Sequence, residues 1–203
     1  MRHVVPGLCA AVLVAGCGSR LTYDYQDYVP ALPRGEPHVV AVAVVDLRLD
    51  VVSRAEKPSR VGSYISFGTF ALSTGTGRPL ADDFADVLIK GLSSAGLKPV
   101  AVHSETGEAV ADVRKHALDA AADRVLLVEI VDWQVENNDW ASTLWQNYRL
   151  TFTVLDRAGK ELVRRPFKNA GAESAFSRFP EEEMFQKIAE TVLGADEFAK
   201  ALH

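Results

Sequence analysis

The sequence predicts an α+β fold in two layers: a mixed sheet of about five strands with helices packed mainly on one face. Three segments carry this prediction. Residues 38–46 form an unbroken Val-rich run, residues 79–94 have helical periodicity, and residues 145–156 alternate between apolar and polar side chains before a hairpin turn. An alternating strand has one polar face, which indicates helices on one side of the sheet only. The expected element order is β(β)αβαβββα.

The first strand, HVVAVAVVD over residues 38–46, is apolar at successive positions, as is typical of a central strand buried on both faces. Residues 47–63 are polar and contain Pro58 and Gly62, so they predict a long loop. Residues 64–72 alternate weakly and indicate a short strand.

The helix expected over residues 79–94 has clear start and stop signals. Pro79 suits a first turn, Asp82 and Asp83 complement the positive end of the helix dipole, and Gly96 suits the stop. Its apolar side chains recur at spacings of three and four and form one stripe, composed of Phe84, Val87, Leu88 and Leu92.

The remaining elements follow from the same two periods. A short strand is expected at 97–102, a helix at 108–122, three consecutive strands at 123–136, 145–156 and 161–167, and a last helix from about Pro180. Together these segments make a single α+β domain over residues 39–203.

The amino terminus has the pattern of a processing signal. Arg2 precedes a short apolar stretch from Val4 to Ala15, which is too short to cross a bilayer as a helix. Leu13, Val14, Ala15 and Gly16 precede Cys17 and resemble the bacterial lipobox, in which small residues admit the signal peptidase and the cysteine receives the lipid. The alternative is an ordinary secretory signal that contains a cysteine by chance. We expect a signal peptide over residues 1–16.

Cysteine usage supports lipidation. Cys9 would leave with the signal, so the mature chain has Cys17 alone and no internal disulfide, and acylation accounts for that single thiol. Gly18 and Ser19 follow Cys17 where inner-membrane lipoproteins of enterobacteria typically carry Asp. By that resemblance we expect the protein on the periplasmic face of the outer membrane, held by acyl chains such as palmitate.

Residues 17–38 are expected to form a lipidated, extended tether. They have neither helical nor strand periodicity, and Pro30, Pro33 and Pro37 interrupt them. Three tyrosines in this segment are candidate partner contacts that could add a strand or dock in a groove; the alternative is that they pack loosely or stay solvated. They are Tyr23, Tyr25 and Tyr28.

Four segments carry a resemblance to known proteins: VVAVAVVDLRLD, PLADDFADVLIKGLSSAGLKPV, ALDAAADRVLLVEIVDW and YRLTFTVLDRAGKELV. They are similar to small bacterial envelope lipoproteins with a TolB-amino-terminal-type fold, such as YajG-like lipoproteins, the penicillin-binding-protein activator LpoB and the curli secretion factor CsgG. The resemblance implies a partner in envelope assembly, secretion or regulation rather than an enzyme, and it brings no catalytic residues.

Direct search for chemistry finds no strong site. The chain lacks H-E-x-x-H and C-x-x-C, so His103, Glu105 and His116 are expected to be solvated rather than metal ligands. The acids Asp82, Asp83 and Asp86 need no function at a helix start. The loop from Gly75 to Arg78 could hold an anion, but a flexible turn explains it as well. We expect no catalytic residues, metal or cofactor.

The most suggestive surface feature is the tryptophan-rich hairpin. Trp133 and Trp145 fall on expected strands and are typical of core or half-buried packing, whereas Trp140 lies beside the hairpin tip. Trp is frequent at protein interfaces and at membrane interfaces, so Trp140 is a candidate partner contact. The alternative is an inert side chain folded back on the sheet.

These observations predict a lipid-anchored periplasmic adaptor or assembly lipoprotein, which binds another envelope protein or its own copies. The alternative is a periplasmic carrier for a lipid, peptide or glycan fragment held between sheet and helices. The net charge of −5 gives no electrostatic footprint for nucleic acid, so no nucleic-acid partner is expected.

Overall fold

The computed structural model describes residues 22–174 and 181–203. The signal peptide and Leu13 to Cys17 therefore lie outside the described residues, as does Pro180. Along the chain, the elements are β1 (Thr22–Tyr23), β2 (Val39–Asp46), α1 (Leu49–Val52), β3 (Arg60–Ile65), β4 (Thr69–Thr74), α2 (Leu80–Ser94), β5 (Lys98–Val102), α3 (Val110–Asp119), β6 (Arg124–Asn138), β7 (Thr143–Asp156), β8 (Glu161–Ser174), α4 (Glu181–Leu193) and α5 (Asp196–Leu202).

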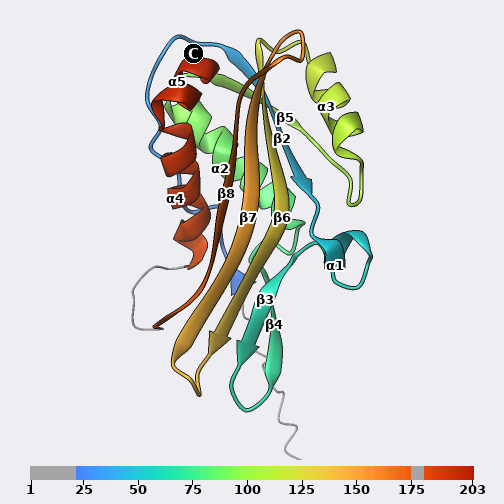
Figure 1. Cartoon of the computed structure of the whole chain (residues 1–203), viewed down its shortest axis with the longest axis vertical. Helices are drawn as coiled ribbons and strands as arrows, with labels where there is room; N and C mark the ends of the chain where they lie inside the picture. Colours follow the sequence, from blue (N-terminus) through green and yellow to red (C-terminus); the bar gives the residue numbers. More distant parts are fainter. Residues whose placement is uncertain (1–21, 175–180) are drawn as a thin grey trace, which may run out of the picture.

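The long strand β6 organises the sheet. Its first half pairs in parallel with β2, and its last residues pair in parallel with β3, so β2 and β3 lie one after the other along the same edge of β6 (Figure 1). The other edge of β6 pairs with β7 along its whole length, with an irregularity between Ile130 and Asp132, and β7 pairs with β8. Parallel and antiparallel pairs therefore occur in one sheet, which confirms the expected mixed sheet.

Helices lie on both faces of this sheet, in unequal measure. One face packs against α2, α4 and α5 in the larger apolar cluster, in which Phe84, Phe185 and Phe198 are fully buried. The other face carries a smaller cluster, where Val113 and Ala117 of α3 meet alternate residues of β2. Figure 1 shows α3 on the side of the sheet opposite α4.

The expected number of strands was too low, because the sheet has eight strands rather than about five. The segment 64–72 contributes a hairpin instead of one strand, since the chain reverses after Ile65 and pairs with itself. A further strand, β1, consists of two residues and pairs with β4. The weak periodicity of these short segments did not indicate pairing with distant strands.

The solvent-exposed face of the sheet is also smaller than expected. Thr151 and Thr153 belong to the polar set of the alternating segment 145–156, yet they are only 8% and 4% exposed. Leu155, on the same face of β7, belongs to the cluster under α3. The alternation of apolar and polar residues in β7 therefore predicts which face of the strand is more polar. It does not predict how much of either face other parts of the chain bury.

Within the described ranges, no helix has the length and apolarity needed to cross a bilayer. The helices expected from periodicity occur close to their expected positions, at 80–94, 110–119 and 181–193. Two short helices, α1 and α5, were not expected from the sequence; they are 4 and 7 residues long.

Candidate functional site

The histidines singled out by the sequence lie apart on the surface. Among residues 22–174 and 181–203, no group of three or more His, Cys, Asp or Glu is arranged to hold a metal ion. The Nδ1 atom of His103 lies 3.3 Å from Asp82, and that of His116 lies 3.1 Å from Glu108. Both imidazoles are more than half exposed, so each is half of a surface pair rather than part of a buried site.

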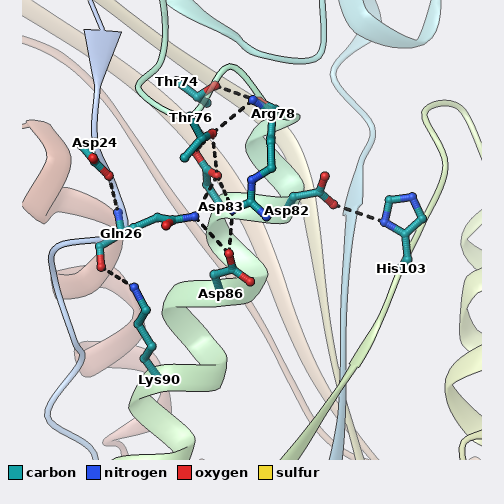
Figure 2. Close-up of polar contacts among 10 residues, drawn as sticks. All are labelled: Asp24, Gln26, Thr74, Thr76, Arg78, Asp82, Asp83, Asp86, Lys90 and His103. Carbon is teal, nitrogen blue, oxygen red and sulfur yellow. Dashed lines mark hydrogen bonds and ion pairs between the residues drawn. The ribbon is translucent and has the colours of Figure 1, made fainter.

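The acids at the start of α2 do form a cluster, around a carboxylate that is fully buried. Asp83 has no exposed surface, and its oxygens accept hydrogen bonds from Thr76 Oγ1 at 2.9 and 3.0 Å and from Arg78 Nη2 at 2.9 Å. Arg78 Nη2 also lies 2.6 Å from Asp86 (Figure 2). Since the guanidinium faces two carboxylates of its own chain, the Gly75 to Arg78 loop does not form an anion site.

Burial governs the electrostatics of this cluster. Removal from water raises the pKa of the Asp83 carboxyl above its ordinary value, and the hydrogen bond from Thr76 and the charge of Arg78 oppose that rise. The hydrogen bond to Asp86 raises the pKa of Arg78 further above its already high ordinary value. Arg78 therefore stays charged, and the cluster is a structural ion pair at the loop before α2.

The same cluster fastens the amino-terminal segment to α2. Gln26 Nε2 donates hydrogen bonds to Asp86 at 3.0 Å and to Asp83 at 3.4 Å, and Lys90 Nζ donates to the Gln26 carbonyl at 2.6 Å (Figure 2). Further along, the ring of Pro30 sits over Gly91, where an added Cβ would lie 3.1 Å from it. Residues 22–38, which the sequence assigned to an extended tether, therefore pack on the domain.

The three tyrosines of this segment have different environments. Tyr25 is 1% exposed, accepts a hydrogen bond from Trp133 Nε1 at 3.2 Å and packs edge-on against Phe84, so its assignment as a partner contact is wrong. Tyr23 packs partly buried against the same cluster, and Tyr28 is half-buried. A local pattern cannot reveal this, because the groove that receives Tyr25 is built by residues far along the chain.

Trp140 stands at the end of the molecule where the β3–β4 and β6–β7 hairpins lie side by side (Figure 1). Its side chain is 68% exposed, its ring meets that of Phe67 edge-on at 5.4 Å, and its Nε1 donates a hydrogen bond to the Ser66 carbonyl. Phe67 is 94% exposed and Phe70 is 52% exposed. We call Phe67, Phe70 and Trp140 the aromatic tip. The sequence indicated Trp140 but not the two exposed phenylalanines of the β3–β4 hairpin.

An open groove of about 480 Å³ lies between α1 and the sheet face beside it. Its walls include Arg48, Trp133 and Arg149. Arg48 is 4% exposed and donates two hydrogen bonds to Asp46 and one each to the carbonyls of Pro58 and Arg60, so it closes the loop after β2 rather than facing a ligand. Next to this groove, Leu49 is 82% exposed.

Among the described residues, one small hollow lies between the sheet and α4. A hollow of about 230 Å³ lies between α4 and strands β7 and β8, with Tyr148, Phe167 and Met184 in its wall. Pockets for small ligands are usually about 300–1,000 Å³ in volume. The stacked rings of Phe84 and Phe185, 3.5 Å apart, fill the core beneath α2 and α4.

No protein-family model matches the chain, and no curated protein matches it. Among solved structures, a DUF330-family protein from Xanthomonas campestris matches with TM-score 0.52 and 12% identity, over 85% of this chain and 92% of that one. A PelC dodecamer from Paraburkholderia phytofirmans matches with TM-score 0.48 and 16% identity, over 82% and 90%. A Neisseria meningitidis lipoprotein matches with TM-score 0.34 and 14% identity, over 77% and 96%. At these identities, the first likeness shows the fold alone.

Proposed function

We propose that the protein is a lipid-anchored envelope protein that acts by binding rather than catalysis, as an adaptor or assembly lipoprotein for another envelope protein or for its own copies. The observation that carries the proposal is the position of the lipobox: Cys17 comes five residues before Thr22, the first residue of β1. A domain fastened so closely to a lipid presents its remaining surface to neighbours in the envelope.

The partner surface that we propose is the open groove beside α1. Leu49 is the most exposed aliphatic side chain of the described surface, and it stands next to polar groups such as Asp132 and Arg149. An apolar anchor with a polar surround is the arrangement found at many transient protein interfaces. The carrier function is the weaker candidate, since the hollow next to α4 is small.

The anchor is tested by labelling cells with palmitate and comparing the native chain with Cys17→Ala. Acylation of the native chain that is lost in Cys17→Ala, together with outer-membrane fractionation, is the expected result. A native chain that is processed without acylation would contradict the lipoprotein assignment and favour the ordinary secretory signal.

The binding surface is tested by placing a photo-crosslinking amino acid at Leu49 in intact envelopes. Lys115, an exposed residue of α3 on a different surface, is the matched control. We expect a discrete cross-linked protein, either an envelope partner or a second copy, from position 49 and not from position 115. Absence of cross-links at position 49 would reject this surface.

A further inference from the structure

The aromatic tip is a built surface rather than a set of loose side chains. The hydrogen bond from Trp140 Nε1 to the Ser66 carbonyl joins the two hairpins, and the edge-on contact with Phe67 holds both rings. The backbone also joins them, because the Asp139 amide donates to the Ile65 carbonyl at 3.0 Å. These contacts keep large apolar rings exposed at one end of the molecule. Large exposed rings held in this way are typical of an interaction surface.

The two hairpins that form the tip carry little charge. Residues 61–74 contain no charged side chain, and residues 137–147 contain only Asp139. The hydroxyl of Tyr64 donates a hydrogen bond to Asp139, and this bond raises the pKa of Tyr64. Moving a charged group out of water is costly, whereas Trp and Phe are favoured at the boundary between headgroups and acyl chains. The tip therefore has the composition of a surface that enters a lipid interface.

The direction of β1 links the tip to the anchor. β1 pairs in parallel with β4, with Thr22 opposite Ser73, and β4 runs away from the hairpin turn that carries Phe67. The amino-terminal end of β1 therefore points toward the tip. Ser73 is four residues beyond Thr69, or about 13 Å along the strand. Cys17 is five residues before Thr22, a span of at most about 18 Å. A lipid on Cys17 thus holds the bilayer within reach of the tip.

We propose that the aromatic tip, formed by Phe67, Phe70 and Trp140, inserts into the headgroup region of the phospholipid bilayer that holds the lipid on Cys17. The inference rests on the proposed lipid anchor and deepens it. The anchor supplies attachment and the tip supplies orientation, so the domain stands on its two hairpins with the opposite end of the sheet farthest from the membrane.

The test replaces the biological anchor with a chemical one. The chain from Cys17 onward has a single thiol and includes every described residue. That thiol is coupled to a maleimide phospholipid in phosphatidylcholine vesicles, either plain or brominated near the top of the acyl chains. Trp140 emission is obtained by subtracting the spectrum of an identically anchored Trp140→Phe variant. We expect bromination to remove about half of this emission, as a Trp at the interface lies next to the bromines.

Three variants make the result specific. Cys17→Ser with Lys160→Cys anchors the protein through the exposed β7–β8 turn, at the other end of β7 from Trp140, and its Trp140 should not be quenched. Phe67→Ser should reduce the quenching of the Cys17-anchored protein, whereas Leu49→Ser, which changes another highly exposed apolar residue, on α1, should leave it unchanged.

Equal Trp140 emission in plain and brominated vesicles would overturn the proposal. It would also be overturned if the unanchored Cys17→Ser chain formed a dimer that Phe67→Ser abolished, because a second copy would then cover the tip. Neither outcome depends on acylation in the cell. Failure of palmitate labelling would therefore reject the proposed function without affecting the vesicle result.

Discussion

Tyr25 and Tyr28 are three residues apart in the same extended segment, yet only one of them belongs to the core. The Tyr25 ring lies 5.4 Å from Phe84 and 6.1 Å from Trp133, both edge-on, and it is 1% exposed. Edge-on pairs of this kind add to the stabilisation that burial alone provides. Tyr28 keeps part of its side chain in solvent.

Replacing Tyr25 should therefore lower the free energy of unfolding much more than replacing Tyr28 does. We expect Tyr25→Ala to lower the free energy of unfolding by about 3–5 kcal/mol, the usual range for removing a buried aromatic ring. Tyr28→Ala is the matched control and should cost less. Urea denaturation measures both, and similar losses for the two variants would contradict the packing described for Tyr25.

The buried Asp83 carboxyl should leave a signature in the pH dependence of stability. Its folded-state pKa is raised above the ordinary value of 3.8, chiefly by burial. At pH values between the ordinary pKa and the raised folded-state pKa, the carboxyl of Asp83 holds its proton in the folded protein but loses it in the unfolded chain. The contribution of Asp83 to the free energy of unfolding therefore falls as pH rises through this range. The amide of Asp83→Asn does not titrate. We expect the stability of the native chain minus that of Asp83→Asn to fall as pH rises above 3.8.

Chemical denaturation at a series of pH values measures this difference. Asp82→Asn is the control, because it removes a neighbouring carboxylate that is partly exposed. A stability difference that increases with pH for Asp83→Asn would mean that the pairing with Arg78 outweighs burial.

At the scale of the elements, β3 depends on a close approach to β6. A Cβ at Gly62 would lie 1.8 Å from the carbonyl oxygen of Val135, which no rearrangement of a side chain can relieve. Gly62 also stands at the irregularity in the β3–β4 register. Glycine at this position allows the hairpin, and with it the aromatic tip, to join the sheet.

Gly62→Ala should therefore detach or displace the hairpin. We expect a loss of about 1–3 kcal/mol or more, the usual range for overpacking a close contact. Gly68→Ala in the turn of the same hairpin is the matched control, because its nearest neighbours would be ring atoms of Phe70 at an ordinary 3.7 Å. Thermal unfolding should separate the two variants, and equal melting temperatures would refute the close approach.

At the scale of the whole molecule, residues 22–38 are part of the fold. They supply Tyr25 to the core, β1 to the sheet and Pro30 to the surface of α2, and the Ala31 amide donates a hydrogen bond to Glu190 on α4 at 2.9 Å. If Cys17 carries a lipid as proposed, only the residues between Cys17 and Thr22 separate that lipid from the first packed strand.

This arrangement predicts opposite effects for two changes in the same region. Deleting residues 22–37 should lower the free energy of unfolding by about 3–5 kcal/mol or more, because the deletion removes Tyr25 together with its neighbours. Inserting ten Gly and Ser residues between Cys17 and Thr22 should leave the unfolding midpoint unchanged, because no contact of the described residues is removed. A deletion that leaves the midpoint of urea unfolding unchanged would mean that residues 22–37 do not pack on the domain.

The strands and helices that the sequence predicted correctly are those with a strong local period. The apolar run of β2, the stripe of α2 and the alternation of β7 depend only on side chains a few residues apart, and those periods are fixed by backbone geometry. The hairpin of β3 and β4 and the two-residue β1 have no such period. They exist because β6 is long enough to pair with β2 and then with β3.

By itself, the sequence determined the mixture of helices and strands, the positions of the main elements, the place of Trp140 beside a hairpin tip, and the lipobox pattern that remains a prediction. Tertiary structure decided that Tyr25 is buried, that Asp83 is a buried structural acid, and that Phe67 and Phe70 join Trp140 at one end of the molecule. The physical reason is that periodicity shows which face of an element is apolar, whereas burial depends on which distant segment covers that face. Only the assembled sheet brings those segments together.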